Sequence, residues 1–213
     1  MKNISFDIFA SYTWPYVYHA GVWLDKVSRL SVIKPKVNWR YFSLEQVNDK
    51  EENSKIWERD SAIKSKELAA FTAAEAARKQ GSEAFDAYHL GLLKARWEDK
   101  IDFSDTRALI TLAGKLGLNT IQFERDISNS NSFSTLARDH SIAVEEYGVF
   151  GTPTFVFENK QAMYLKVVSV PEEEALSAYE TLISLMNSKN FVGEMKRPQP
   201  PWPQGAMRRS WTI

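Results

Sequence analysis

Residues 11–21, with the sequence SYTWPYVYHAG, concentrate side chains that could act on a ligand. They offer the hydroxyls of Ser11 and Thr13, three tyrosines and the imidazole of His19, which titrates near neutral pH. Trp14 offers one N–H donor and no acid–base chemistry. The chain contains no cysteine, so it has no thiolate nucleophile, disulfide or thiolate metal ligand of its own.

The other two histidines indicate no metal centre. His89 and His140 fall on apolar stripes of predicted helices, where we expect hydrogen-bonded core side chains. The three histidines lie on separate helices and lack the spacing of metal ligands. No metal site is therefore predicted.

The elements that position residues 11–21 are a strand and a helix. Ile4, Phe6 and Ile8 alternate with polar residues, which is the period of a β-strand. Pro15 suits the first position of a helix, which we expect to run to about Leu30. The segment VNWRYFSL (37–44) then predicts a second strand, so the three elements form a parallel βαβ unit.

The rest of the chain divides into three parts. Residues 51–148 are predicted to be helical throughout, followed by a β-hairpin with its turn at 159–160 and a final helix opened by Pro171. We therefore assign 1–50 and 149–190 to one α/β domain and 51–148 to a helical insertion. Residues 191–213 are a proline-rich C-terminal tail, expected to be extended.

The order of these elements, the turn before the first helix and a motif before the hairpin resemble the DsbA-like thioredoxin-fold family. The resemblance covers nearly the whole chain, and its most specific motif is GVFGTPTFVF (148–157). The nearest groups are the FrnE-like branch and the related 2-hydroxychromene-2-carboxylate isomerases and kappa-class glutathione transferases. The resemblance implies a thioredoxin fold with a mixed sheet and a large helical insertion. It also implies a cis-proline at Pro153 that faces the start of the first helix.

The redox motif of that family is lost. Its Cys-Pro-x-Cys sequence falls on Trp14, Pro15, Tyr16 and Val17, so the proline remains and both sulfurs are gone. The isomerase and transferase branch places a serine at the first cysteine position, where its hydroxyl assists the thiol of glutathione. Trp14 cannot replace that serine.

The resemblance leaves three functions open. In the first, the protein binds a peptide or small thiol in a groove between Trp14 and Thr152-Pro153, with Tyr18 and His19 beside it. In the second, it is a glutathione-dependent isomerase or transferase that uses a tyrosine or a histidine for proton transfer, and the hydroxyl of Ser11 or Thr13 takes the place of the missing serine. In the third, Trp14 fills the groove and the protein is a non-catalytic interaction partner. The only cofactor implied is glutathione or a similar low-molecular-weight thiol.

Composition narrows the class of partner. Lys plus Arg equals Asp plus Glu, at 27 each, so the chain lacks the basic excess of a nucleic-acid-binding protein. No apolar run approaches the length of a membrane span, and the N-terminus lacks a signal-peptide core. We therefore expect a soluble cytoplasmic protein. A peptide or small-molecule ligand is what the resemblance implies, and the oligomeric state stays open.

Overall fold

The computed structural model describes residues 4–51, 54–59, 62, 64–128 and 133–195. In chain order the elements are β1 (Ser5–Ala10), α1 (Pro15–Leu30), β2 (Lys36–Tyr41), α2 (Leu44–Asn48), the 3-10 turn η1 (Ile56–Glu58), α3 (Lys66–Arg78), α4 (Ser82–Trp97), α5 (Thr106–Lys115), α6 (Thr120–Ile127), α7 (Phe133–Tyr147), β3 (Thr154–Phe157), β4 (Ala162–Tyr164) and α8 (Ala175–Ser188). Residues 196–213 of the predicted tail lie outside the described residues.

The four strands form one mixed sheet in the order β2-β1-β3-β4. β1 pairs with β2 in parallel, as the βαβ prediction requires, and antiparallel with β3, which in turn pairs antiparallel with β4. The register aligns Ile8 with Trp39 and with Phe155. The carboxyl ends of β1 and β2 and the start of β3 therefore lie at one edge of the sheet.

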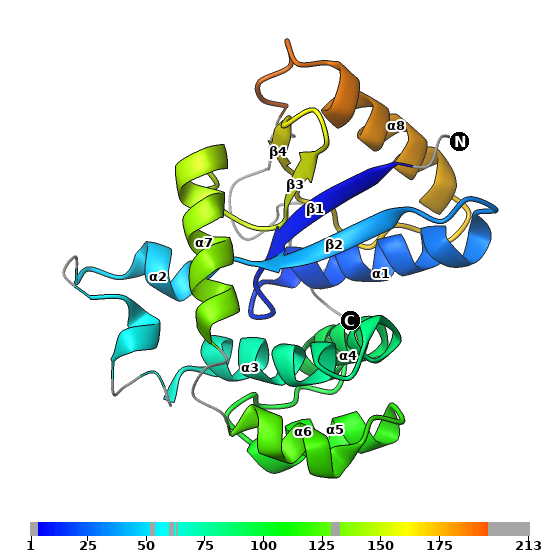
Figure 1. Cartoon of the computed structure of the whole chain (residues 1–213). Coiled ribbons are helices and arrows are strands. Elements are labelled where there is room, and N and C mark those ends of the chain that lie inside the picture. The colour runs from blue at the N-terminus through cyan, green and yellow to red at the C-terminus, as the bar shows by residue number, and fades with distance from the viewer. Residues whose placement is uncertain (1–3, 52–53, 60–61, 63, 129–132, 196–213) are drawn as a thin grey trace, which may run out of the picture.

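The period of two along β1 divides the core between the two faces of the sheet. Phe6 and Ile8 belong to the large core with α1 and α8. Phe9, which points the other way, belongs to a smaller cluster with Phe42 and with Ala143 of α7. Helices thus cover both faces, and α3–α6 gather in one bundle beside the sheet (Figure 1).

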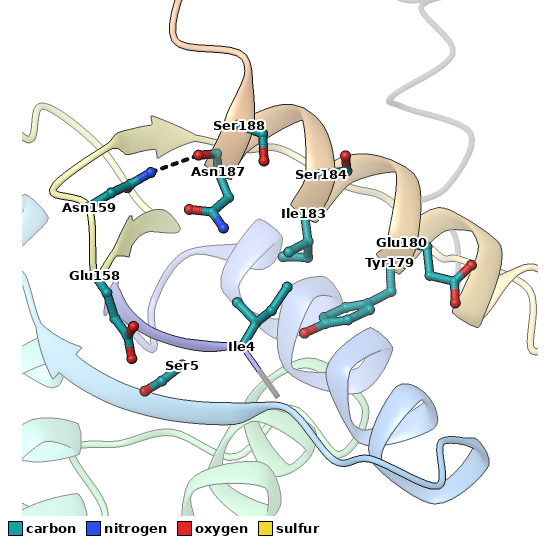
Figure 2. A pocket seen from close by; sticks show the side chains of 10 residues that line it. All are labelled: Ile4, Ser5, Glu158, Asn159, Tyr179, Glu180, Ile183, Ser184, Asn187 and Ser188. Carbon is teal, nitrogen blue, oxygen red and sulfur yellow. Dashed lines mark hydrogen bonds between the residues drawn. The ribbon is translucent and has the colours of Figure 1, made fainter. Parts of the chain in front are cut away.

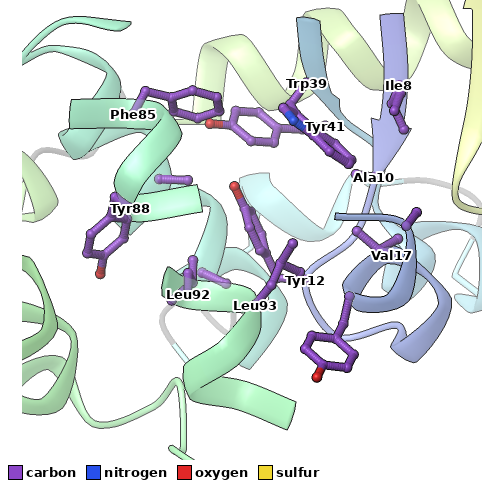
Figure 3. Close-up of a cluster of buried hydrophobic side chains, with 14 of the residues drawn as sticks. Ile8, Ala10, Tyr12, Val17, Trp39, Tyr41, Phe85, Tyr88, Leu92 and Leu93 are labelled. Carbon is purple, nitrogen blue, oxygen red and sulfur yellow. The ribbon is translucent and has the colours of Figure 1, made fainter. Parts of the chain in front are cut away.

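The large core continues without interruption from the sheet into the helical bundle. Side chains of β1, β2, α1 and α4 meet there, with Tyr12 among them (Figure 3). A Cβ added to Gly21 would lie 2.7 Å from Cδ1 of Leu93, so α1 and α4 approach closely at this glycine. Trp23 is 1% exposed and donates its indole N–H to the Ala175 carbonyl at 3.0 Å, which joins α1 to α8.

Three predicted boundaries are wrong. The second strand ends at Tyr41 rather than residue 44, because Ser43 caps α2 by accepting a hydrogen bond from the Gln46 N–H. The described residues of 51–65 include the 3-10 turn η1 but no α-helix, and α3 begins only at Lys66. The last helix begins at Ala175, after a turn that follows Pro171.

Each helix among the described residues is too short or too polar to cross a lipid bilayer.

Candidate functional site

The four residues that replace the redox motif begin α1. Trp14 is the N-cap residue, without a side-chain cap, and Pro15 occupies the first helical position. The Trp14 N–H donates to the Ser11 carbonyl at 3.2 Å, and the Trp14 carbonyl accepts from the Val17 N–H at 3.1 Å. Val17 and Tyr16 are buried, but Trp14 is only partly buried. The indole therefore reaches the surface at the start of the helix.

The cis-proline loop lies before β3. The Thr152–Pro153 peptide bond is cis. The Pro153 carbonyl accepts a hydrogen bond from the Leu165 N–H at 3.1 Å, one residue beyond the Thr154–Tyr164 pair of the hairpin. Pairing of the two strands thus places the residues that follow β4 next to the cis-proline loop.

A cation and four rings meet beside this loop. The Lys166 Nζ lies 5.9 Å from the ring centroid of Trp14, 5.1 Å from that of Tyr16 and 5.3 Å from that of Tyr164. The Phe150 ring, whose residue is 69% exposed, lies 5.1 Å from the Tyr164 ring. We call these five residues the Lys166 patch. Lys166 connects the start of α1 to the hairpin, a link that sequence analysis missed.

Thr152 is the least satisfied polar residue of the loop. It is fully buried, and among the described residues its hydroxyl has no hydrogen-bond partner. Across that same part of the chain, no hydrogen bond reaches its backbone N–H or carbonyl. Buried polar groups are normally paired, so Thr152 is an exception, and because it is 0% exposed a ligand reaches it only when the loop moves aside.

Tyr18 and His19 lie on the next turn of α1. The Tyr18 hydroxyl donates to the Glu98 carboxylate at 2.9 Å, just past the end of α4, and burial raises its pKa to about 12. His19 is 6% exposed and its ring lies against that of Tyr18, so burial lowers the His19 pKa. Tyr18 thus faces the helical bundle, and a ligand role for these two residues stays a prediction.

A buried carboxylate that sequence analysis did not single out holds the turn before α1. Glu67, on α3, is fully buried, and its carboxylate accepts hydrogen bonds from the Ser11 and Ser43 hydroxyls, the latter at 2.5 Å. It also accepts from the backbone N–H groups of Leu44 and Glu45, both at 3.0 Å. Burial raises the pKa of Glu67, and these hydrogen bonds oppose that rise.

Both hydroxyls that could have replaced the missing serine are engaged by Glu67. Ser11 donates to this carboxylate, and the Thr13 hydroxyl approaches the same oxygen at 3.4 Å. The two hydroxyls also lie 2.9 Å from each other. Ser11 is fully buried as well, so it is poorly placed to assist a thiol.

The other two histidines support the same edge of the sheet from inside. The Tyr12 hydroxyl lies 2.8 Å from Nδ1 of His89, whose pKa burial lowers to about 3. Nδ1 of His140 accepts from the Ser43 N–H at 3.2 Å. Burial, with a smaller contribution from the charge of Lys55, lowers the His140 pKa to about 4. Nε2 of His89 is buried without a partner among the described residues, so the prediction that this histidine is satisfied is only half right.

An open depression of about 600 Å³ lies at the opposite end of β1 (Figure 2). It is lined by Ile4, Ser5, the β3–β4 turn and one side of α8. Across one edge of it, the side-chain amide of Asn159 donates a hydrogen bond to the Asn187 carbonyl at 2.7 Å. None of the residues predicted to form the site lines this depression. The described part of the chain also brings together no group of three or more potential metal ligands.

A family model described as a DSBA-like thioredoxin domain matches residues 6–177. No curated protein matches the chain. The family and the thioredoxin fold with a helical insertion, which the motifs predicted, are thereby confirmed.

Solved structures share this fold at low sequence identity. A 2-hydroxychromene-2-carboxylate isomerase is 17% identical with a TM-score of 0.60, over 90% of this chain and 100% of its own. A probable DsbA oxidoreductase from Streptomyces coelicolor is 15% identical with a TM-score of 0.59, over 95% and 98%. The cytosolic disulfide reductase DsbM from Pseudomonas aeruginosa, solved with GSH, is 15% identical with a TM-score of 0.58, over 85% and 100%.

Replacing Glu67 by glutamine will destabilise the fold. Each carboxylate oxygen of Glu67 accepts from one backbone N–H, that of Leu44 or of Glu45, and an amide keeps only one such acceptor. We expect Glu67→Gln to lower the free energy of unfolding by about 1–3 kcal/mol in urea titrations. The exposed Glu83→Gln on α4 is the control, expected within about 0.5 kcal/mol of wild type. Equal stability of the two variants would contradict the role of Glu67.

Stability will also fall in mild acid because of His140. Its pKa is lower in the folded chain than the usual 6.5, so the unfolded state binds the proton more readily and stability is lost as pH falls from about 6.5 to 4. His140→Phe preserves the stacking on Phe42 and removes the titration. We expect this variant to be less stable at pH 7. On acidification its unfolding free energy should fall less steeply than that of the wild type, the difference between the two slopes being at most ~1.4 kcal/mol per pH unit. Parallel pH profiles of unfolding free energy would refute this assignment.

Proposed function

The chain belongs to the DSBA-like thioredoxin domain family, and we propose that it binds an extended peptide beside its cis-proline loop without exchanging disulfides. Thiol–disulfide exchange is the attack of a thiolate on a disulfide sulfur. This chain has no cysteine to supply either group. What this chain keeps of the family's motifs is the proline at the start of α1 and the cis-proline loop before β3.

The observation that carries the proposal is the unsatisfied state of Thr152. Its buried hydroxyl and its backbone have no hydrogen-bond partner among the described residues. An extended peptide that pairs with the backbone of a protein supplies one N–H and one carbonyl per residue. Because Thr152 is 0% exposed in this structure, such a ligand would satisfy it by displacing the side chains that cover it, whereas a compact apolar ligand would leave it unpaired.

The surface beside Thr152 suits peptide side chains. Trp14 is partly exposed and Phe150 is largely exposed, in a patch otherwise built from tyrosine rings. Aromatic rings give flat apolar contact at a low cost in side-chain entropy. Trp14 packs against the large core and keeps part of its surface exposed, and that exposed part supports contact with a ligand.

A glutathione-dependent isomerase or transferase is the second candidate, based on the fold shared with 2-hydroxychromene-2-carboxylate isomerase. It requires a group that assists the thiol at the start of α1. Trp14 lacks such a group, and the hydroxyls of Ser11 and Thr13 are directed to Glu67. This candidate is therefore the weaker one.

Removing the Trp14 ring will weaken peptide binding. The probe is an acetylated and amidated pentapeptide, Gly-Phe-Val-Phe-Gly, titrated by calorimetry. We expect a dissociation constant in the micromolar to millimolar range, roughly −4 to −8 kcal/mol. Trp14→Ala should weaken it by about tenfold, while Phe191→Ala, which removes an exposed ring beyond α8, should leave it unchanged.

The other functions predict different results in the same experiment. Binding of glutathione without peptide binding would favour the isomerase or transferase. If neither ligand binds and Trp14→Ala lowers the unfolding free energy by roughly 3–5 kcal/mol, Trp14 is core and the groove is closed.

A cysteine pair will test the placement of the lost motif. The double variant Trp14→Cys, Val17→Cys should form a disulfide at the start of α1 when oxidised, because these positions match the spacing of the family's Cys-Pro-x-Cys sequence. Thiol counting in the folded protein after treatment with oxidised glutathione measures it, with the single variant Trp14→Cys as the control. Two free thiols in a folded double variant would show that the motif lies elsewhere.

A further inference from the structure

We propose that the Lys166 patch selects acidic peptides, with Lys166 binding a ligand carboxylate while the neighbouring rings hold an apolar side chain. This inference rests on the proposed peptide-binding function and names the class of peptide. It concerns a residue outside the motifs that sequence analysis singled out.

Lys166 is held in position by its surroundings although it is exposed. Its ammonium lies within 6 Å of the centroids of Trp14, Tyr16 and Tyr164, which is the range of cation–π attraction. The Leu165 N–H, one residue earlier, is bonded to the Pro153 carbonyl. The charge therefore lies beside the loop where the proposed peptide binds.

The ammonium has no acidic partner within the described chain. The ion pairs of these residues join other cations, among them Arg40 to Asp139 and Lys66 to Asp102, and none includes Lys166. Aromatic faces attract a cation without cancelling its charge. A carboxylate on the ligand complements this charge, whereas a basic ligand is repelled.

The arrangement of the patch also fixes the spacing within the ligand. Phe150 and Lys166 both lie beside the Tyr164 ring, at 5.1 Å from ring to ring and 5.3 Å from ammonium to ring. In an extended peptide, residues i and i+2 point to the same side, about 7 Å apart. We therefore expect an apolar residue and an acidic residue separated by one position.

Three peptides that differ in one charge test the selection. They are acetyl-Gly-Gly-Phe-Thr-Glu-Gly-Gly-amide and the same sequence with Gln or Lys in place of Glu, titrated by calorimetry. We expect the Glu peptide to bind about three- to five-fold more tightly than the Gln peptide at low salt, and the Lys peptide to bind most weakly. The difference should shrink in about 0.5 M salt, where charges are screened.

Variants of this chain identify the responsible charge. Lys166→Gln should abolish the preference for Glu over Gln, and Lys166→Glu should reverse it in favour of the Lys peptide. Lys36→Gln removes another exposed charge at the start of β2, the other end of the sheet, and should keep the full preference.

The outcomes separate this inference from the proposed function. If the Glu and Gln peptides bind wild type equally, peptide binding stands and acidic selection is overturned. Retention of the preference in Lys166→Gln would likewise overturn it. If none of the three peptides binds, the proposed function fails and this inference fails with it.

Discussion

The site depends on the hydrogen bonds that the buried carboxylate of Glu67 accepts. This carboxylate joins three segments far apart in the sequence: the turn after β1, the start of α2, and α3 of the helical bundle. A buried carboxylate is stable only when donors surround it, and here two backbone N–H groups and two serine hydroxyls do so. Because Ser11 lies three residues before Trp14, the position of α1 is tied to the helical bundle through this side chain.

Several polar side chains near the start of α1 hold the fold together, so they are not available for chemistry on a ligand. Ser11 and Thr13 are directed to Glu67, and Tyr18 is bound to Glu98. The groups that these hydrogen bonds leave unengaged are the aromatic rings, the Lys166 ammonium and the buried Thr152 hydroxyl. These groups can bind and orient a ligand, but none of them is an activated nucleophile. The distribution of hydrogen bonds therefore favours recognition over covalent chemistry.

The sequence predicted those parts of the fold that depend on local signals. Three signals each act within a few residues: the alternation in β1, Pro15 at the start of α1 and the motif around Pro153. The order of the elements and the family could therefore be predicted from them directly. The roles of Glu67 and Lys166 depend on pairing across 56 residues in one case and between α1 and a hairpin in the other. Glu67 sits in an alanine-rich helix and resembles a solvated charge, so no pattern in one sequence marks it as buried.

Under the proposed function, replacement of the redox motif exchanges a covalent ligand contact for a non-covalent one. In redox members the start of the first helix stabilises a thiolate that bonds covalently to its substrate. Here the same position carries an indole, and the lysine after β4 lies against its ring. A covalent sulfur link is tight and tolerates many partners, whereas stacking and one charge are weak and depend on the ligand's side chains. Under the proposed function, the choice of partner therefore falls to the surface around Thr152, where the Lys166 ammonium among aromatic rings would discriminate by charge.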